Sequence, residues 1–448
     1  MSFLEGEKII IEGVILRSGS YRAATNSISD GKNLFELIYS YHLEEGSCFR
    51  VSGEIVNFRG ILKLKVLETE PVPNSVYEKT EKKAMDSAPI KEQFIYEDET
   101  TRKLKEKIIL FSRKLYAAMH LRKNCAVRFH NDGDGICGAI CINLFLKGEY
   151  IQQNSAIYSI RDAMRDISNL SNSKHPLLVL VDFGSNEESF EALSLIKSAK
   201  IEVLIIDHHP VFEKTMEGFE VLNFWETKNP LSSKYTAGYI CAEISHLLGN
   251  DSTTYAKIAL NSDKSDLMDY TLDEKNAGLV LNYAAAYSSH QTSLNFYRSI
   301  LKNKDLFDSM LYQAQDKIDQ LVSVSRNQMK EKKIKEFNLY YLNLGALVKK
   351  FEFPGLGKSA TQIFDALIPK DKPSILLCYG PKSIVLRLND LAVEKGANAN
   401  EIIEYLKSSA PGVIESGGGH IRAAAIRVRE EFEKSMIDEI INYLENLN

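Results

Sequence analysis

Residues 176–182 of the chain have the sequence PLLVLVD, and residues 201–209 have the sequence IEVLIIDHH. Each stretch contains a short, nearly continuous run of apolar residues that is followed by an aspartate. Runs of this kind are typical of strands that are buried on both faces of a parallel sheet. A third run, CAVRF at residues 125–129, is followed by HNDGDG at residues 130–135. Because helical stretches separate these strands, the sequence predicts an α/β domain with a parallel sheet.

Acidic residues and histidines come directly after each of the three predicted strands. In chain order they are His130, Asp132, Asp134, Asp182, Asp207, His208 and His209. Ligands bind to open α/β sheets at the carboxyl ends of the strands, so we expect these side chains to lie close together. A fourth acidic cluster, NSDKSDLMD at residues 261–269, follows a helical stretch.

The residue types in these clusters predict a cation site. Carboxylates packed this densely would repel one another unless a divalent cation neutralised them. Carboxylate and imidazole ligands suit Mn²⁺, Mg²⁺ or Zn²⁺, and the large share of oxygen ligands favours Mn²⁺ or Mg²⁺. We expect Gly133 and Gly135 to give the backbone the freedom that lets Asp132 and Asp134 point at one centre. A single aspartate after a strand is commonly a helix N-cap, but three such clusters are typical of a metal site.

Residues 1–75 have a different pattern, in which glycines separate short strands. In ILKLKVLE, residues 61–68, apolar residues alternate with lysines, as in a strand with one buried face. The segment resembles the OB-type barrels of nucleic-acid enzymes, and an SH3-like barrel is the alternative fold. The candidates for base stacking and phosphate contacts are Arg17, Tyr21, Arg22, Phe35, Phe58 and Arg59.

The rest of the chain is predicted to form a linker and two lobes. Residues 76–104 combine proline, serine and mixed charge without clear periodicity, which predicts a linker. We expect the α/β domain to cover residues 105–300 and a connecting helix to cover residues 301–335. Residues 336–448 again mix strands and helices, which predicts a smaller second α/β or α+β domain.

The composition is that of an ordinary soluble protein, with 44% hydrophobic and 26% charged residues. No run of about 18 uncharged apolar residues occurs, and the charged N-terminus does not resemble a secretory signal. We therefore expect a cytoplasmic protein without a membrane partner, in which the six scattered cysteines are reduced and buried. The net charge of −5 excludes an overall basic surface for nucleic acid, although residues 101–123 are locally basic.

Four motifs occur in the order that is found in the DHH phosphoesterase superfamily, and the chain resembles that family. The motifs are HNDGDG at residues 130–135, DFG at 182–184, DHHP at 207–210 and SDL at 265–267. The segment ESGGGH, residues 415–420, resembles the GGGH motif of the DHH-associated C-terminal domain. Two lobes with these motifs, preceded by an OB-type domain, are similar to RecJ-like single-strand exonucleases, especially the archaeal group.

This resemblance implies two Mn²⁺ or Mg²⁺ ions that lie about 3.5–4 Å apart and activate water. The implied ligands are His130 and Asp132 for one metal, Asp134, His208 and Asp266 for the other, and Asp182 for both. His209 would contact the scissile phosphate or complete the shell of the second metal, and Asp207 would orient the histidines. Asp263 is an alternative to Asp266, because the spacing in this motif departs from the family pattern.

The resemblance also implies that the second lobe binds the substrate phosphate. The implied residues are Arg387, Gly417, Gly418, Gly419, His420 and Arg422. Three successive glycines would let neighbouring backbone N–H groups face one anion in a nest, and a histidine after them can donate a hydrogen bond to a phosphate oxygen. The segment PGLGKS, residues 354–359, is not expected to bind nucleotide, because Glu352 stands where a phosphate-binding loop needs glycine.

The function predicted from these features is metal-dependent exonuclease action on single-stranded DNA or RNA, in replication, repair or RNA turnover. One alternative is a small-substrate phosphodiesterase that acts on nano-oligonucleotides or cyclic dinucleotides. Another is a scaffold in a replication complex, with a GINS-like partner, as in members of the superfamily that have lost catalysis. Loss of catalysis predicts eroded ligands, whereas the ligand set in this chain is essentially complete.

Overall fold

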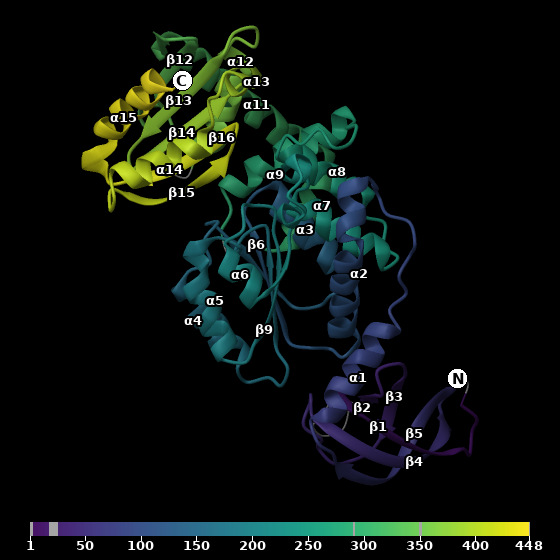
Figure 1. The fold of residues 1–448 in the computed structure, drawn as a ribbon. Coiled ribbons are helices and arrows are strands. Elements are labelled where there is room, and N and C mark those ends of the chain that lie inside the picture. Colours follow the sequence, from purple (N-terminus) through teal and green to yellow (C-terminus); the bar gives the residue numbers. More distant parts are fainter. Residues whose placement is uncertain (1–2, 18–25, 290–291, 349–351, 448) are drawn as a thin grey trace. The chain divides into compact units, whose positions relative to one another are not determined.

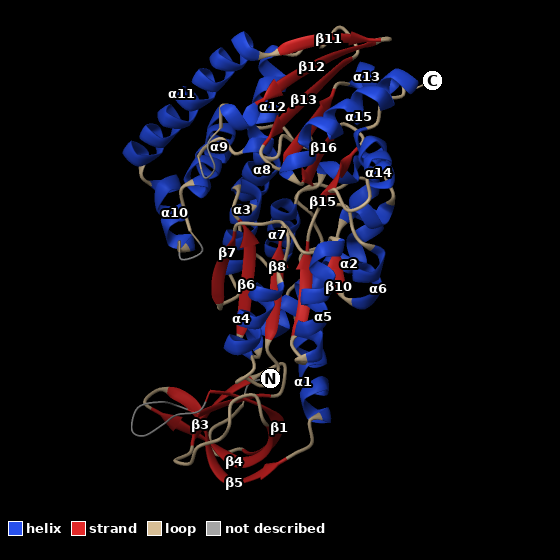
Figure 2. Cartoon of the chain, turned by 90° about the vertical axis from the view of Figure 1, so that its left-hand side faces the viewer, coloured by secondary structure: helices blue, strands red, loops and turns tan. Residues whose placement is uncertain are grey.

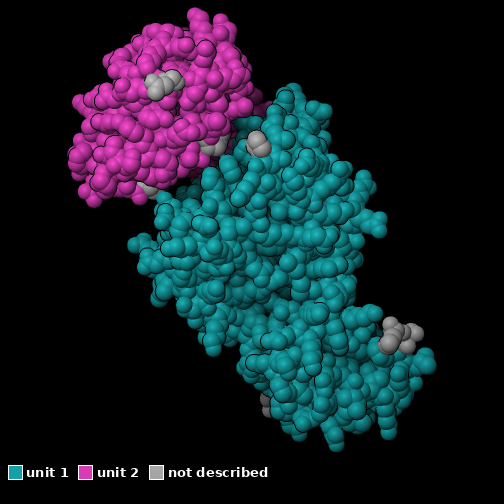
Figure 3. All heavy atoms as spheres, viewed as in Figure 1, with its two compact units in different colours: residues 1–275, 290–294 teal, residues 276–289, 295–448 magenta. Residues whose placement is uncertain are grey.

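The computed structural model describes residues 3–17, 26–289, 292–348 and 352–447. The chain divides into two compact units, residues 1–275 with 290–294 and residues 276–289 with 295–448 (Figure 3). The boundary between the two lobes, predicted near residue 300, therefore falls inside helix α9 (Leu272–Ala286).

The first unit begins with a closed five-stranded barrel in the order β1-β2-β3-β5-β4 (Figure 2). Its strands are β1 (Lys8–Arg17), β2 (Asn26–Ser29), β3 (Leu34–Ile38), β4 (Cys48–Phe58) and β5 (Ile61–Pro71). Strands β3 and β5 pair in parallel. The interior is filled by alternate apolar side chains such as Ile15, Val51 and Leu64, all fully buried. The barrel confirms the fold predicted for residues 1–75 and is of the OB type.

The barrel residues predicted to bind nucleic acid have different surroundings. Phe35 lies in the barrel core against Phe3, so it is not a stacking surface. Phe58 is 45% exposed at the β4–β5 turn, and the guanidinium of Arg59 lies 5.4 Å from the centre of its ring. Tyr21 and Arg22 lie outside the described residues, as does the side chain of Arg17.

The predicted linker contains a helix, which differs from the sequence prediction. Helix α1 (Ser75–Asp86) buries Val76, Tyr77, Thr80 and Ala84. Their spacing puts all four on one face, which packs between the barrel and helix α2 (Glu99–His120). The segment is helical because its short apolar stripe packs against the barrel on one side and against helix α2 on the other.

The barrel is attached to the edge of the parallel sheet at which the strands begin. The ring of His175, two residues before strand β8 (Leu177–Val181), stacks on Tyr77 of α1 with 3.4 Å between ring centres. Lys174 pairs with Glu44 of the barrel at 2.6 Å. The buried ammonium of Lys123, before strand β6, pairs with Glu81 of α1.

The parallel sheet has five strands in the order β10-β9-β8-β6-β7. They are β6 (Cys125–His130), β7 (Glu149–Gln153), β8, β9 (Glu202–Ile206) and β10 (Glu220–Leu222), and every neighbouring pair is parallel. All five residues of β8 are buried. This confirms the predicted doubly covered sheet, and it brings the carboxyl ends of β6, β8 and β9 to one edge.

Helices cover both faces of this sheet (Figure 1). Helices α4 (Ile160–Leu170) and α5 (Phe190–Ser198) pack on one face. Helices α3 (Gly133–Asn143) and α7 (Ala237–Leu247) lie on the other, with α8 (Thr253–Ser262) packed on both of them. A Cβ atom on Gly138 would lie 2.7 Å from Val181 and 3.3 Å from Gly238, so the close approach of α3 to the sheet and to α7 requires glycine there. The short helix α6 (Glu213–Gly218) precedes β10.

The second unit is built on a six-stranded sheet in the order β11-β12-β13-β14-β16-β15. Its strands are β11 (Lys330–Ile334), β12 (Phe337–Asn343), β13 (Ser374–Gly380), β14 (Ser383–Leu388), β15 (Ile414–His420) and β16 (Ala423–Val428). Its further helices are α10 (Leu294–Lys302), α11 (Lys304–Gln328), α12 (Leu356–Leu367), α13 (Asp390–Glu394), α14 (Ala399–Ser409) and α15 (Glu433–Asn446). Only β12 and β13 pair in parallel among these described strands. This mixed sheet confirms the predicted second α/β domain.

Two further expectations concern the cysteines and the absence of a membrane-spanning helix. All six cysteines are buried and free. Within the described ranges, the structure contains no helix that combines the length and the apolar character required to span a bilayer.

Candidate metal centre

The turn between β6 and α3 supplies the first three candidate ligands. His130 ends β6, Asp132 is the N-cap of α3, and Asp134 lies in the first helical turn. The Asp132 carboxylate accepts the N–H of Gly135 at 3.1 Å. A Cβ atom on Gly135 would lie 2.3 Å from the His130 carbonyl oxygen, whereas its φ angle is not left-handed. Glycine is therefore required here for space rather than for the backbone freedom that the sequence suggested.

Asp134 is completely buried and points at the N-terminus of α7. Its two carboxylate oxygens accept the N–H groups of Ala237 at 3.0 Å and Gly238 at 2.9 Å. These bonds and the positive end of the helix dipole stabilise the charged form. Burial nevertheless raises the pKa of Asp134 well above its usual value, and the nearby charge of Asp182 raises it further.

Asp182, directly after β8, has the left-handed backbone angle φ = 69°. That region is disfavoured for a residue with a Cβ atom, although aspartate tolerates it better than most. The N–H of Asp182 donates to the Ile206 carbonyl of β9 at 2.8 Å, which holds the turn. The side chain is 1% exposed. Left-handed residues of this kind cluster at functional sites.

The loop after β9 carries Asp207, His208 and His209, and Asp207 organises it. One carboxylate oxygen of Asp207 accepts the backbone N–H groups of both histidines. The same oxygen lies 2.8 Å from Nδ1 of His209, while the other accepts the hydroxyl of Ser185. Burial alone would raise the pKa of Asp207, but the charge and hydrogen bond of His209, the hydroxyl of Ser185 and the charge of His208 together outweigh burial and hold that pKa far below its usual value. Asp207 is therefore a carboxylate that accepts the Nδ1 proton of His209.

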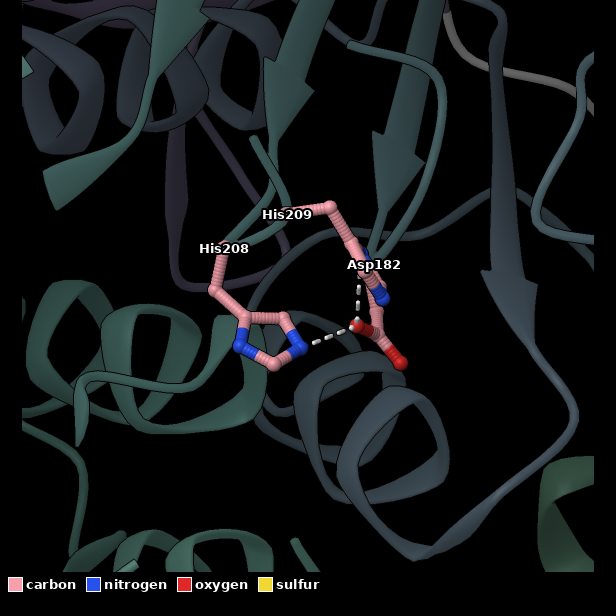
Figure 4. Close-up of side chains that lie close together, drawn as sticks. All are labelled: Asp182, His208 and His209. Carbon is pink, nitrogen blue, oxygen red and sulfur yellow. Dashed lines mark ion pairs between the residues drawn. The ribbon is translucent and has the colours of Figure 1, made fainter. Parts of the chain in front are cut away.

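The carboxylate of Asp182 lies between His130 and His208. Its Oδ1 is 3.2 Å from Nε2 of His208 and 3.9 Å from Nδ1 of His209 (Figure 4). Its Oδ2 is 3.4 Å from Nδ1 of His130, which is also 3.3 Å from Asp132. The two oxygens of one carboxylate thus face two different groups of ligands.

The side chains form three overlapping groups whose donor atoms lie within 4.8 Å of one another. The groups are His130 with Asp132 and Asp182, Asp134 with His208 and Asp263, and Asp182 with His208 and His209. Their members come from four segments of the chain that are far apart in sequence. These acidic and histidine clusters could bind metal ions.

The polar atoms of the cluster show that it fits a cation. Nδ1 of His130, Oδ1 of Asp182 and Nε2 of His208 are buried and make no hydrogen bond to any described residue. Buried polar atoms are normally hydrogen-bonded, so each needs a partner such as an ion. Burial lowers the pKa of His208, but the adjacent carboxylate of Asp182 and the charges of Asp134 and Asp263 raise it well above its usual value overall. Without a metal ion, the site therefore favours protonation of His208, whereas a bound cation would supply the positive charge that neutralises the carboxylates.

The fourth motif differs from the predicted ligand assignment. Oδ2 of Asp263, after α8, lies 3.4 Å from Nε2 of His208, and its side chain is 25% exposed. The Asp266 side chain is 74% exposed and pairs with Lys234 at 2.7 Å. The structure therefore brings the alternative, Asp263, to the cluster and leaves Asp266 outside it. Lys264, with φ = 58°, turns the chain between the two aspartates.

Three groups around the cluster were not predicted from the sequence. They are the hydroxyl of Ser185, which donates to Asp207, and the side chains of Asn223 and Trp225, which donate to the backbone carbonyls of His209 and His208. None of them belongs to a motif with a known spacing. The Ser185 position follows the DFG motif directly, which is the one sequence signal that could have indicated it.

In the second unit, the three glycines predicted to form an anion-binding nest have a different conformation. Gly417, Gly418 and Gly419 lie in strand β15 and pair with Ile426, Ala425 and Ala424 of β16. Successive N–H groups of a strand point in opposite directions, so these three cannot face a single anion. Cβ atoms at Gly417 and Gly419 would lie 2.5 Å from Ile426 and 2.3 Å from the Ala423 oxygen. The nest was therefore a wrong prediction, and Gly417 and Gly419 permit close strand packing.

The other predicted phosphate-binding residues of the second unit are also placed. The guanidinium of Arg387 on β14 donates to the Thr361 hydroxyl and to the carbonyls of Gly357 and Leu386. Arg422 is largely exposed and pairs with Asp390 at 2.9 Å. His420 ends β15, and its side chain lies outside the described part. Phosphate binding by these residues stays a prediction.

The fold and site together define an α/β protein with a buried carboxylate–histidine cluster at the carboxyl ends of its parallel strands. Residues 124–268, which contain the cluster, match the model of the DHH family, N-terminal domain. This stretch of the chain is therefore similar to the DHH family, and the fold resembles that of the DHH-domain and RecJ structures described below.

Known proteins resemble the chain over most of its length. An uncharacterized protein of Methanocaldococcus jannaschii is 26% identical over an alignment that covers 86% of this chain and 59% of that protein, so the chain spans about three fifths of this relative. A structure described as the DHH domain of a member of a family of ribosomal proteins has a TM-score of 0.73 at 20% identity, over 84% of this chain and 98% of that one. RecJ from Thermus thermophilus in complex with Mn²⁺ has a TM-score of 0.50 at 14% identity, over 79% of this chain and 56% of that one.

Proposed function

We propose that this chain is a metal-dependent exonuclease that hydrolyses phosphodiester bonds of single-stranded DNA or RNA. The observation that carries the proposal is the position of Asp182, whose two carboxylate oxygens face His130 on one side and His208 on the other. A carboxylate placed in this way suits a pair of divalent cations, which would be Mn²⁺ or Mg²⁺ for this donor set. The similar Thermus thermophilus RecJ structure was solved with Mn²⁺.

Each group of the cluster has a separate task in this proposal. His130 and Asp132 would hold one cation, Asp134, His208 and Asp263 the other, and Asp182 both; this is the family assignment with Asp263 in place of Asp266. When bound, the cations supply the Lewis acidity that activates water for attack on phosphorus. In the hydrolysis, one P–O ester bond breaks as the water oxygen bonds to phosphorus.

His209 is the residue of the cluster that is best placed to touch the substrate. Its side chain is 43% exposed, whereas that of His208 is 12% exposed. Asp207 accepts the Nδ1 proton, so the ring presents Nε2 away from that carboxylate. Burial lowers the pKa of His209, but the charge and hydrogen bond of Asp207 act in the opposite direction, and the pKa lies above its usual value overall. A protonated His209 can donate a hydrogen bond from Nε2 to a phosphate oxygen.

Helix α2 connects the cluster with the barrel, which supports an extended substrate. At its N-terminus, Asp98 accepts the hydroxyl of Tyr235, close in sequence to the α7 residues that bind Asp134. At its C-terminus, His120 lies 2.9 Å from the Ser29 hydroxyl of the barrel. A nucleic-acid strand bound by both the barrel and the cluster would have to pass along the length of this helix. At 1.5 Å per residue its 22 residues measure about 33 Å.

The experiment is digestion of 5′- and 3′-labelled single-stranded DNA and RNA, with and without Mn²⁺. We expect the wild-type chain to shorten a strand from one end and to stop when a chelator is added. Asp182→Asn, which keeps the shape of the side chain, should abolish the activity. Digestion that continues in this variant or in excess chelator would rule out the proposal.

A small-substrate phosphodiesterase is the second candidate, and one observation favours it. The barrel is attached where the parallel strands begin, while the cluster lies where they end. The barrel therefore does not border the metal cluster. Initial rates on two-nucleotide and thirty-nucleotide strands separate the two functions. An exonuclease should prefer the long strand, and a small-substrate enzyme should prefer the dinucleotide.

A scaffold without catalysis is the third candidate, and the intact cluster argues against it. The four donor-bearing segments meet, and their buried atoms leave hydrogen-bonding capacity for a cation. A protein selected only for assembly would gain nothing from retaining mutually repulsive buried carboxylates. An active nuclease that also associates with replication proteins remains compatible with the structure.

A further inference from the structure

The loop between β10 and α7 contacts three of the four segments that contribute to the metal cluster. We propose that Asn223 and Trp225 in this loop are positioning residues that set the orientation of His208 and His209 for the cations. This inference rests on the proposed function, because it concerns the same cation site. The loop, residues 223–238, is called the 223–238 segment below.

The first part of the 223–238 segment holds the two histidines by their backbones. The Asn223 side-chain amide donates to the His209 carbonyl at 2.8 Å, and the Trp225 indole N–H donates to the His208 carbonyl at 2.7 Å. Asp207 binds the N–H groups of the same two histidines. The backbone N–H and carbonyl groups of both His208 and His209 are therefore held by hydrogen bonds. This restricts the directions in which the two rings can point.

Asn223 is itself fixed, so it can act as a rigid support. It is fully buried, and its side-chain oxygen accepts the backbone N–H of Trp225 at 3.0 Å. This bond caps the 3₁₀ turn η2 (Phe224–Thr227). One amide side chain thus connects the turn with the His209 loop.

The last part of the 223–238 segment contacts the other ligands. Its final residues, Ala237 and Gly238, donate their N–H groups to Asp134. The carbonyl of Lys234 accepts the hydroxyl of Ser265, which lies two residues after Asp263. The segment therefore links the ligands after β6 and β9 with the loop that carries the fourth acidic ligand.

A stacked pair of aromatic rings connects the first and last parts of the segment. The rings of Phe224 and Tyr235 are parallel within 1° and 4.0 Å apart, and both side chains are fully buried. Tyr235 also packs edge-on against Tyr239 of α7. Because the stack joins the two ends of the segment, a displacement at the histidines would be resisted by the packing of α7.

The partners of metal ligands typically change metal affinity by about 10–100-fold when they are removed. We therefore expect Asn223→Asp and Trp225→Phe each to weaken Mn²⁺ binding at least tenfold, measured by isothermal titration calorimetry. Asn223→Asp keeps the oxygen that caps η2 but replaces the donor to His209 with a second oxygen. Trp225→Phe keeps an aromatic ring without the indole N–H.

Asn389→Asp is the matched control variant. Asn389 caps α13 in the second unit by accepting the N–H of Ala392, and its amide donates to the Lys372 carbonyl, so its chemistry is the same as that of Asn223. We expect this variant to bind Mn²⁺ as tightly as the wild-type chain. A purely structural role for Asn223 would lower the melting temperature of the metal-free protein and leave the affinity unchanged.

Trp225 is the single tryptophan of the chain, so its fluorescence gives a second readout in the unmodified protein. We expect Mg²⁺, which does not quench by paramagnetism, to change the Trp225 emission along the same binding curve as calorimetry. Asp182→Asn should abolish that change. If wild type binds Mn²⁺ while both variants bind it within twofold of wild type, the positioning inference fails and the proposed function stands. If wild type binds no Mn²⁺, the proposed function itself fails, and the inference with it.

Discussion

Oδ1 of Asp182 lies 3.2 Å from Nε2 of His208, and neither atom makes a hydrogen bond to the described residues. Both side chains are almost fully buried, so water cannot fully supply the hydrogen bonds that these two atoms lack. The charges of Asp132 and Asp263 reinforce the repulsion among carboxylates at this point. The cluster is therefore arranged for a bound cation at a cost to the stability of the metal-free protein.

Asp182→Asn should therefore abolish the stabilisation that bound Mn²⁺ gives to the wild-type chain. With Mn²⁺ at about 100 times its Kd, the wild-type chain should gain about 2.7 kcal/mol and the variant nothing. Thermal melts of both proteins, in chelator and in Mn²⁺, measure this. An equal gain in melting temperature for both proteins in Mn²⁺ would contradict the prediction.

The fourth motif offers a direct comparison of two aspartates three residues apart. Asp263→Asn should lower Mn²⁺ affinity and nuclease rate by at least tenfold, because Asp263 lies 3.4 Å from His208. Asp266→Asn should change both by less than twofold, because Asp266 is exposed and pairs with Lys234. Calorimetry and single-strand digestion on the two variants test the assignment. A larger loss with Asp266→Asn would return the ligand role to that residue.

Much of the fold could be predicted from the sequence because the signals are local. The apolar runs that end at Val181 and Ile206 can only be strands buried on both faces, and the aspartates after them meet because parallel strands share an edge. The fourth motif follows a helix, where no such rule applies. Which of Asp263 and Asp266 points inward depends on the left-handed turn at Lys264, which the sequence does not specify.

Two other differences arose from contacts that are distant in sequence. Helix α1 has a weak apolar stripe, and it forms where a linker was predicted because the barrel and α2 cover both of its sides. The glycines at residues 417–419 were expected in a turn, but pairing with β16 draws them into a strand. In both cases the tertiary partner overrides the local propensity of the segment.

Glu243 on α7 should make the stability of the first unit depend on pH. Its carboxyl is buried and accepts the N–H of Ile95 and the hydroxyl of Tyr239. Burial raises its pKa from 4.5 to about 7, against the opposite effect of these hydrogen bonds. The protonated acid is thus favoured by folding, and its contribution to stability is complete below pH 4.5 and lost as pH rises through 7.

Glu243→Gln should remove this dependence, because the amide cannot ionise. Between pH 5 and pH 8 the wild-type chain should lose about 2–3 kcal/mol of unfolding free energy relative to the variant. Denaturant unfolding at several pH values, followed by Trp225 fluorescence in the first unit, measures the difference. Parallel pH profiles for the two proteins would refute the assignment to Glu243.

A buried ion pair between the parallel sheet and helix α4 allows a prediction about the free energy of unfolding. Arg128 on β6 donates two hydrogen bonds to Asp166 of α4, at 2.7 and 2.8 Å, and the two side chains are 3% and 0% exposed. Arg128→Met leaves the carboxylate uncompensated and should cost about 3–5 kcal/mol. The double variant Arg128→Met/Asp166→Leu should recover most of that loss. A double-mutant cycle in denaturant tests this, and simple additivity of the two single losses would argue against it.

The exposed turn of the barrel offers a test of whether the proposed exonuclease acts on long strands. Phe58 is 45% exposed, and the cationic groups of Arg59 and Lys63 lie 5.4 and 5.3 Å from its ring centre. An aromatic ring beside two cations suits a stacked base with its phosphate. Stacking contributes about 1–3 kcal/mol per base, so Phe58→Ala should raise KM for a thirty-nucleotide strand by roughly 5- to 150-fold.

The described barrel residues meet the parallel-sheet domain at the edge remote from the cluster, as in the Lys174–Glu44 pair, so Phe58→Ala should leave hydrolysis of a dinucleotide unchanged. Ile10→Ala is the matched control, because Ile10 is an apolar side chain that is 70% exposed on β1 of the same barrel and has no aromatic ring on which a base could stack. It should alter neither substrate. If Phe58→Ala slows both substrates equally, the barrel supports the fold of the catalytic domain instead of holding the strand. If it affects neither substrate, this turn of the barrel does not bind nucleic acid, and the small-substrate function gains support.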